Sequence, residues 1–110
     1  MPNRSYFEIF LRSESGENLE PLPEMKQILE QVSGYHIEQN QWSLKIDEAC
    51  WDRFEEDMRF ISLQFPDTEF YVMGEADEYQ NYWHASFLNG KGCIKRAEIV
   101  YPDIKAEELV

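Results

Sequence analysis

The dipeptide Asn89-Gly90 lies between two segments in which apolar and polar residues alternate, 79–88 and 91–101. Asn-Gly is typical of a tight β-hairpin turn, because both residues tolerate a positive φ. The two segments are therefore expected to be antiparallel partners, with Pro102 ending the second strand. This hairpin makes an antiparallel sheet the framework of the fold.

The turn leaves two registers open, and a shift of one residue moves every side chain to the other face of the sheet. A two-residue turn sets Trp83 opposite Arg96. A three-residue turn that includes Lys91 pairs apolar residues with one another: Trp83 with Ala97, Phe87 with Cys93 and Tyr79 with Tyr101. Because the second choice gathers apolar side chains on one face, we expect the three-residue turn.

Other segments also have the composition of strands. Residues 5–12 (SYFEIFLR) alternate, and residues 68–74 (TEFYVMG) are rich in residues that favour β structure. A further strand is expected within residues 35–46, where three apolar residues alternate with polar ones. Residues 13–20 are polar and are expected to form an exposed loop.

Two helices are expected between these strands. Pro21 and Pro23 are expected to open the first helix, which ends before Gly34, a residue suited to the position after a helix. Asp47 is expected to cap a second helix over 48–64, which Pro66 ends. The second helix has a narrow apolar stripe that we expect to be buried: Trp51, Phe54, Met58, Ile61 and Phe65.

These elements predict an α+β fold with the order β-α-β-α-β-β-β. The sheet is expected to be antiparallel and to end in a three-strand meander, with two helices on one face. The 110 residues form one domain, 1–110, which is large enough to bury a core. An apolar content of 43% argues against disorder, despite the charge.

Negative charge is concentrated in one third of the chain. Eleven of the 22 carboxylates lie between Asp47 and Glu78, where Arg53 and Arg59 are the only bases, so this segment carries −9 of the net −12. Such self-repulsion is a cost in the folded state. Two uses are open: contact with a basic partner, or solubility.

The same composition predicts the compartment and disfavours several partners. A pI near 4.4 disfavours direct binding to nucleic acid or to an anionic membrane. No apolar run is long enough to span a bilayer, and the first sixteen residues lack the pattern of a signal peptide. We therefore expect a cytoplasmic protein in which Cys50 and Cys93 are reduced, buried thiols.

The sequence contains no pattern typical of catalysis or metal binding. Only His36 and His84 are available to activate a cysteine, and no Cys or His pair has the spacing of a zinc site. Residues 74–78 (GEADE) lack the ligand pattern of a calcium loop and are expected to be a solvated acidic loop. We therefore expect no enzyme activity, no cofactor and no metal site.

Two apolar residues stand out on the second helix. Phe60 and Leu63 lie off its apolar stripe, beside Asp52 and Glu56. Either the C-terminal tail covers them, or they form the apolar centre of an acidic binding surface. The candidate partner-binding residues are the acids and exposed apolar side chains of this region: Asp52, Glu55, Glu56, Phe60, Leu63, Asp67, Glu69, Glu75, Asp77, Glu78 and Tyr82.

Residues 57–92 contain a series of short motifs: a helix that runs into S-x-x-F-P-D, a strand, a G-E acidic loop, a strand with tryptophan, and an N-G-K turn. The matching positions are Ser62, Phe65, Pro66, Asp67, Gly74, Glu75, Trp83, Asn89, Gly90 and Lys91. This series resembles small acidic α+β domains of bacteria and phages, which have no established activity. At the level of class, the chain is similar to phage counter-defence inhibitors, the anti-CRISPR and anti-restriction proteins, some of which imitate DNA.

Together, charge and resemblance predict a non-enzymatic, acidic protein-binding module. In its concrete form it is an inhibitor and DNA mimic, whose 47–78 surface occupies the basic nucleic-acid-binding surface of a partner enzyme. One alternative is an immunity protein or antitoxin that neutralises a toxin. A further alternative is a small enzyme or metal-dependent factor.

Overall fold

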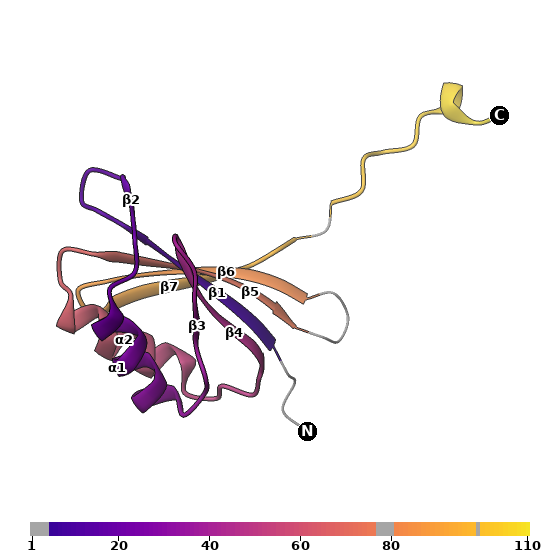
Figure 1. Ribbon diagram of the computed structural model, residues 1–110. Helices are drawn as coiled ribbons and strands as arrows, with labels where there is room; N and C mark the ends of the chain where they lie inside the picture. Colours follow the sequence, from indigo (N-terminus) through magenta and orange to yellow (C-terminus); the bar gives the residue numbers. More distant parts are fainter. Residues whose placement is uncertain (1–4, 77–80, 99) are drawn as a thin grey trace.

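The computed structural model describes residues 5–76, 81–98 and 100–110, and its fold is α+β (Figure 1). A seven-stranded antiparallel sheet has the order β3-β4-β1-β5-β6-β7, and β2 pairs with the end of β1. The elements follow the chain as β1 (Ser5–Arg12), β2 (Asn18–Leu19), α1 (Pro23–Ser33), β3 (Glu38–Gln39), β4 (Ser43–Ala49), α2 (Phe54–Gln64), β5 (Glu69–Ala76), β6 (Asn81–Leu88), β7 (Lys91–Arg96) and the 3₁₀ helix η1 (Ala106–Glu108). Apart from the two-residue strands β2 and β3, the predicted order is confirmed, and β5, β6 and β7 form the predicted meander.

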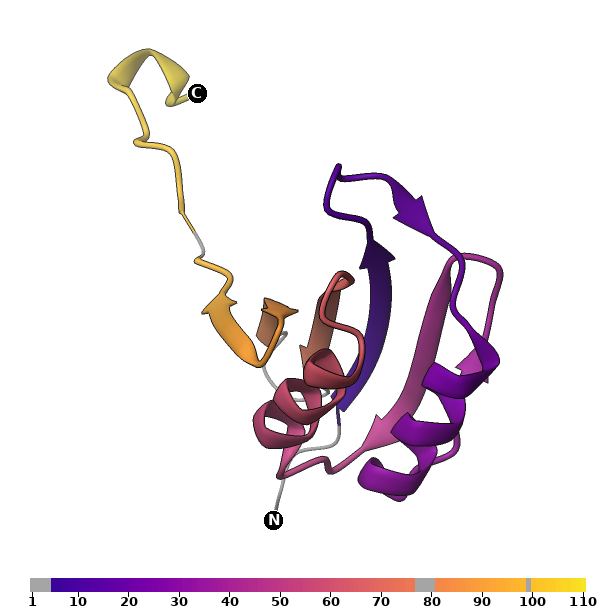
Figure 2. The ribbon, with the colours of Figure 1, turned by 90° about the vertical axis from the view of Figure 1, so that its left-hand side faces the viewer.

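Both helices cover the same face of the sheet (Figure 2). The core between the two layers is built from alternate strand residues and from one stripe of each helix. Its fully buried members include Ile9, Leu11, Leu29, Leu44, Ile46, Met58, Ile61, Phe70, Val72 and Phe87. In the part of the chain that the structure describes, no helix covers the opposite face, which we call the open face. The open face carries the other alternate residues, among them Glu8, Phe10, Arg12, Lys45, Tyr71, Met73, Glu75, Tyr82, His84, Ser86, Leu88, Lys91, Cys93 and Lys95.

The register expected for the last hairpin is wrong. Its turn has two residues, Trp83 lies opposite Arg96, and the ladder begins at Leu88 and Lys91. Both turn residues have the positive φ that a tight hairpin needs, 48° at Asn89 and 79° at Gly90. The expected pairing of Tyr79 falls outside the described residues.

The reason for this register is a close approach between a ring and a glycine. Phe87 lies opposite Gly92 rather than Cys93. A Cβ atom added at Gly92 would lie 2.4 Å from Cδ1 of Phe87, so only glycine leaves room for the ring. The expected register was chosen because it pairs apolar residues with one another. That choice overlooked glycine as a partner that leaves space for the phenylalanine ring.

The second helix is shorter than expected. It begins at Phe54, not at 48, and Asp47 lies in β4 and does not cap it. Pairing of β4 with β1 continues to Ala49, so residues 48 and 49, which were expected in the helix, belong to the sheet. Trp51 is nevertheless buried, because its ring packs in the core. Its polar Nε1 is not left without a partner, since it donates a hydrogen bond to the Asp57 carboxylate at 2.7 Å.

Three other expectations have mixed outcomes. Phe54, Met58 and Ile61 are buried as predicted, whereas Phe65 is only partly buried. The helix α1 ends as predicted at Gly34, whose φ is 77°. The prediction of buried thiols is wrong for Cys93, which is exposed on β7, and Cys50 is only partly buried.

The chain after β7 leaves the body of the protein as an extended arm (Figure 1). We call residues 97–110 the C-terminal arm. Every described residue of this arm is exposed, including the short helix η1. The described residues of the C-terminal arm, 97–98 and 100–110, therefore add nothing to the core.

Candidate functional site

Acidic residues from separate strands meet at one end of the sheet. Ser5, at the start of β1, pairs with both Ala49 at the end of β4 and Ala76 at the end of β5. Three neighbouring strands therefore contribute side chains to one open hollow, and its lining residues are Tyr6, Asp47, Glu48 and Glu75. Three carboxylates around a single tyrosine make this hollow strongly negative.

The N-terminus of α2 adds more acids at the same end. Asp52 follows Ala49 by three residues and is exposed, as are Glu55 and Glu56 in the first turn of the helix. These three carboxylates line a second hollow between α2 and Ile94 of β7. We call the two hollows together the acidic end. Negative side chains at this position also stabilise the helix by facing the positive end of its dipole.

Two of the helix acids have basic neighbours within the chain. Arg53 donates to Glu56 through Nη2 at 2.6 Å and through Nε at 3.1 Å. Arg59 Nη2 lies 4.0 Å from Glu55 Oε2. The pKa of Arg53 is raised, first by its hydrogen bond with Glu56 and then by the charge of that carboxylate. The negative field of the acidic end is therefore weaker at α2 than the number of acids indicates.

An apolar stripe continues from these acids along the exposed side of α2. Phe60 and Leu63 follow Glu56 at i+4 and i+7, and their side chains are 47% and 55% exposed. Leu63 also lies against the hairpin turn, where a Cβ atom added at Gly90 would be 2.8 Å from its Cδ2. The described part of the C-terminal arm does not cover them, so one of the two alternatives, cover by the tail, is wrong.

The remaining candidate residues are not all at the acidic end. Tyr82, 47% exposed, lies opposite Glu75 and belongs to this end. Glu69 lies at the other end of β5, with Asp67 just before it, and Glu75 is six positions along the strand from Glu69, about 20 Å away. Asp77 and Glu78 lie outside the described residues.

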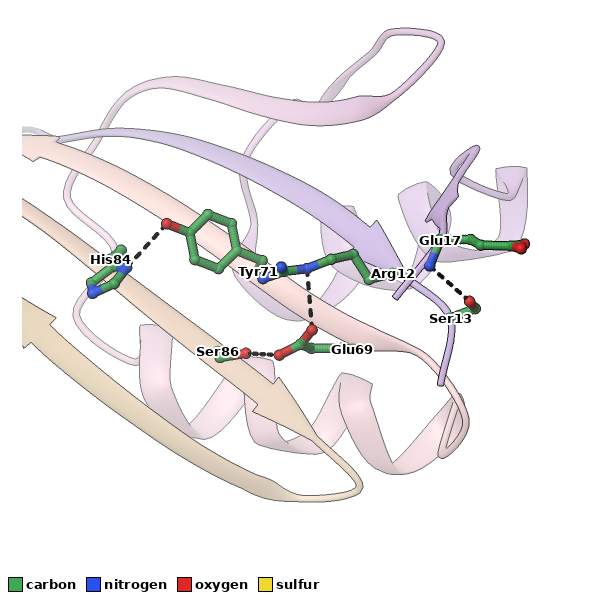
Figure 3. A network of polar contacts seen from close by, with 7 residues as sticks. All are labelled: Arg12, Ser13, Glu17, Glu69, Tyr71, His84 and Ser86. Atoms are coloured by element: carbon green, nitrogen blue, oxygen red, sulfur yellow. Dashed lines mark hydrogen bonds and ion pairs between the residues drawn. The ribbon is translucent and has the colours of Figure 1, made fainter. Parts of the chain in front are cut away.

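Glu69 belongs to a polar network on the open face (Figure 3). Its carboxylate accepts a hydrogen bond from Ser86 and lies 3.1 Å from Arg12 Nε. Arg12 also lies over the ring of Tyr71, at 4.8 Å from the centroid, and the Tyr71 hydroxyl forms a 3.0 Å hydrogen bond with His84 Nδ1. The charge of Glu69 is therefore neutralised inside the protein.

The network surrounds a shallow hollow between β1, β5, β6 and β7. Its lining residues are Arg12, Glu69, Tyr71, His84, Ala85, Ser86, Cys93 and Lys95. We call it the open-face hollow. Sequence reasoning missed it, because its members are alternate residues of four strands and can be grouped only once their register is known.

Sequence reasoning also missed Asp47 and Glu48 as site residues, because it assigned both to the start of a helix. The only signal that could have found them was their place at the end of a segment of strand-like alternation, 43–46. Glu48 has a positive φ of 50°, at the irregular end of the pairing between β4 and β1. This turn of the backbone brings two successive acids to the rim of one hollow.

The described residues contain no group of three or more His, Cys, Asp or Glu side chains that could hold a metal ion. No described helix is long and apolar enough to cross a membrane. Comparison of the chain with protein families, with curated proteins and with solved structures gives no match. The interpretation of the acidic end therefore depends on its own geometry and charge.

Proposed function

We propose that the protein is a non-catalytic binding module whose acidic end contacts a basic surface of a partner protein. The observation that carries the proposal is the presence of two acidic hollows at one end of the sheet: one is lined by Asp47, Glu48 and Glu75, and the other by Asp52, Glu55 and Glu56. Placing like charges together costs free energy in the isolated protein, and a basic partner would offset that cost. Phe60 and Leu63, exposed beside these acids, would supply the apolar part of the contact.

The form that we favour is an inhibitor that covers the nucleic-acid-binding surface of its partner. Such surfaces place Lys and Arg side chains where they contact phosphates. The carboxylates of these two hollows can take the place of phosphates without any nucleobase being present. Complementary charge would also speed association, in a manner that depends on salt.

The test compares the wild-type chain with two variants of equal net charge. The first reverses three exposed acids of the acidic end, Asp47→Lys, Asp52→Lys and Glu75→Lys. The matched control reverses three exposed acids elsewhere: Glu14→Lys, Glu17→Lys and Glu24→Lys. Both should fold, because exposed charges contribute little to stability individually, and circular dichroism checks this.

Each chain is immobilised and exposed to a lysate of its host, and captured proteins are quantified by mass spectrometry. We expect one basic protein to be retained by the wild type and the control but lost with the first variant. Its association rate with the wild type should fall as salt rises, and a nucleic acid bound to it should be displaced. Equal capture by both variants would contradict the proposal. Capture of a protein that is toxic by itself and binds no nucleic acid would favour an immunity protein instead.

A further inference from the structure

The C-terminal arm exposes large apolar side chains without covering anything in its own chain. Val100, Tyr101, Ile104 and Leu109 are 78%, 83%, 78% and 72% exposed. Figure 1 shows the arm leading away from both the sheet and the helices. Apolar side chains gathered in one exposed segment are typical of a segment that becomes buried against a partner.

The open face offers an uncovered surface of matching character. Met73 on β5 and Leu88 on β6 are 50% and 45% exposed on the same face as the open-face hollow, and Met73 lies opposite His84, which lines it. Antiparallel sheets can leave one mainly polar face in water, and Met73 and Leu88 are large apolar side chains on such a face. The open-face hollow is lined by residues of β1, β5, β6 and β7, so an extended segment that crosses these strands passes over it.

The charges of the two surfaces are complementary. Between Glu98 and Glu108 the arm carries four acids and one base, 1 − 4 = −3. The lining of the open-face hollow contains Arg12 and Lys95 against the single acid Glu69, 2 − 1 = +1. Because Arg12 is paired with Glu69, Lys95 is the base of this lining that remains for an acid of the arm, and it lies on β7, the strand that the arm follows. Lys91 lies on the same face of β7.

We propose that the arm of one copy lies across the open face of a second copy, and that the exchange is reciprocal. Residues 97–104 can span about 26 Å at ~3.3 Å per residue, whereas crossing from β7 to β1 needs only about 14 Å. Tyr101 and Ile104 enter the open-face hollow, and the acids of the arm lie beside Lys91 and Lys95. The pairing is isologous, so it closes as a two-fold dimer.

A second copy is favoured over the arm's own sheet by the direction of the chain. The Ala97 N–H donates to the Tyr82 carbonyl at 2.8 Å, which continues the pairing of β7 with β6 one residue past Arg96. From there the arm extends outward (Figure 1). A return onto its own open face would need a sharp reversal directly after this hydrogen bond.

The first experiment measures association of the 110-residue chain by sedimentation velocity over a range of concentrations. We expect a monomer–dimer equilibrium in the wild type. The double variant Tyr101→Ser/Ile104→Ser, which alters only exposed arm residues, should raise the dimer dissociation constant at least tenfold. Leu22→Ser, at an exposed apolar residue just before α1, is the matched control and should leave it unchanged. A wild type that stays monomeric at 0.5 mM, or equal effects of the arm variant and the control, would overturn the proposal.

Two further measurements address the charge and the direction of docking. Lys95→Glu should raise the dissociation constant, whereas Lys26→Glu on α1, with the same change of charge, should not; equal effects would contradict the proposed contact. In mixtures of a ¹⁵N-labelled wild type and an unlabelled chain with a spin label at residue 104, the amides of Tyr71 and Ser86 should broaden. If broadening occurs only when label and amide are in the same chain, the arm folds back on itself and the exchange is wrong.

Discussion

Replacing Gly74 with alanine sets two physical effects of opposite sign against each other. Gly74 lies within β5 and is not among the glycines with positive φ, so alanine can adopt its backbone conformation. Loss of glycine's freedom in the unfolded chain should therefore stabilise the fold by about 0.4–1 kcal/mol. Yet a Cβ atom at this position would lie 2.0 Å from Cε2 and 2.1 Å from Cζ2 of Trp83.

Trp83 has little room to move away. It lies opposite Gly74 on the neighbouring strand, and its ring centroid is 5.5 Å from that of Phe7 and 4.9 Å from that of Phe54. Forcing extra volume into such a packed cluster costs about 1–3 kcal/mol. Since that cost exceeds the gain in the unfolded state, we expect a net destabilisation of about 1–2 kcal/mol.

Urea denaturation followed by far-UV circular dichroism measures the free energy of unfolding of each variant. In the Trp83→Leu background the smaller side chain leaves room, so Gly74→Ala should become neutral or stabilising. Gly16→Ala is the control: its φ is 84° and no atom lies within 4 Å, so its cost is purely conformational and should not depend on residue 83. Stabilisation by Gly74→Ala in the wild type, or the same cost in both backgrounds, would refute the steric argument.

Three further predictions concern packing, a buried hydroxyl and a surface amine. Phe54→Ala should lower the free energy of unfolding by about 3–5 kcal/mol in urea denaturation, because it leaves a cavity among four aromatic rings. Ser62→Ala should cost about 1–3 kcal/mol in the same assay, because the fully buried hydroxyl accepts the Gly90 N–H at 2.8 Å; a neutral effect would show that water replaces it. The pKa of Lys45 is raised, chiefly by the Glu8 carboxylate, so Glu8→Gln should lower it in an NMR titration. This pairing favours the folded state at neutral pH and is lost only as pH rises through the pKa of Lys45, and an unchanged pKa in the variant would contradict it.

Local periodicity predicted most of the sheet but not the extent of α2. The strands β1 and β6 alternate in sequence as they alternate in space, so their period of two was sufficient. In contrast, Trp51 and Phe54 have a helical spacing although only Phe54 is in the helix. Two buried residues at i and i+3 do not show that the backbone between them is helical. Here the pairing of β4 with β1, which extends to Ala49, delays the start of the helix.

The charge of the site was predicted better than its arrangement. The density of acids along the chain is a property of sequence alone, and it marked the segment that contains Glu69 and Glu75. Which acids meet depends on strand register, because β1 brings Glu75 to Asp47 and gives Glu69 to Arg12. Glu69 and Glu75 are close in sequence but lie at opposite ends of β5. Asp47 and Glu75 are far apart in sequence but line the same hollow.

The same register has a consequence for the two proposed surfaces. Glu75 and Glu69 lie at opposite ends of β5, and of these two only Glu69 is paired with an arginine. Negative charge therefore remains at the Glu75 end, whereas the Glu69 end can attract an acidic arm. Partner binding at the acidic end and exchange of arms across the open-face hollow should then be independent. The arm variant should still capture the basic partner, and the variant with a reversed acidic end should still dimerise. Loss of both properties in either variant would mean that the two surfaces are one.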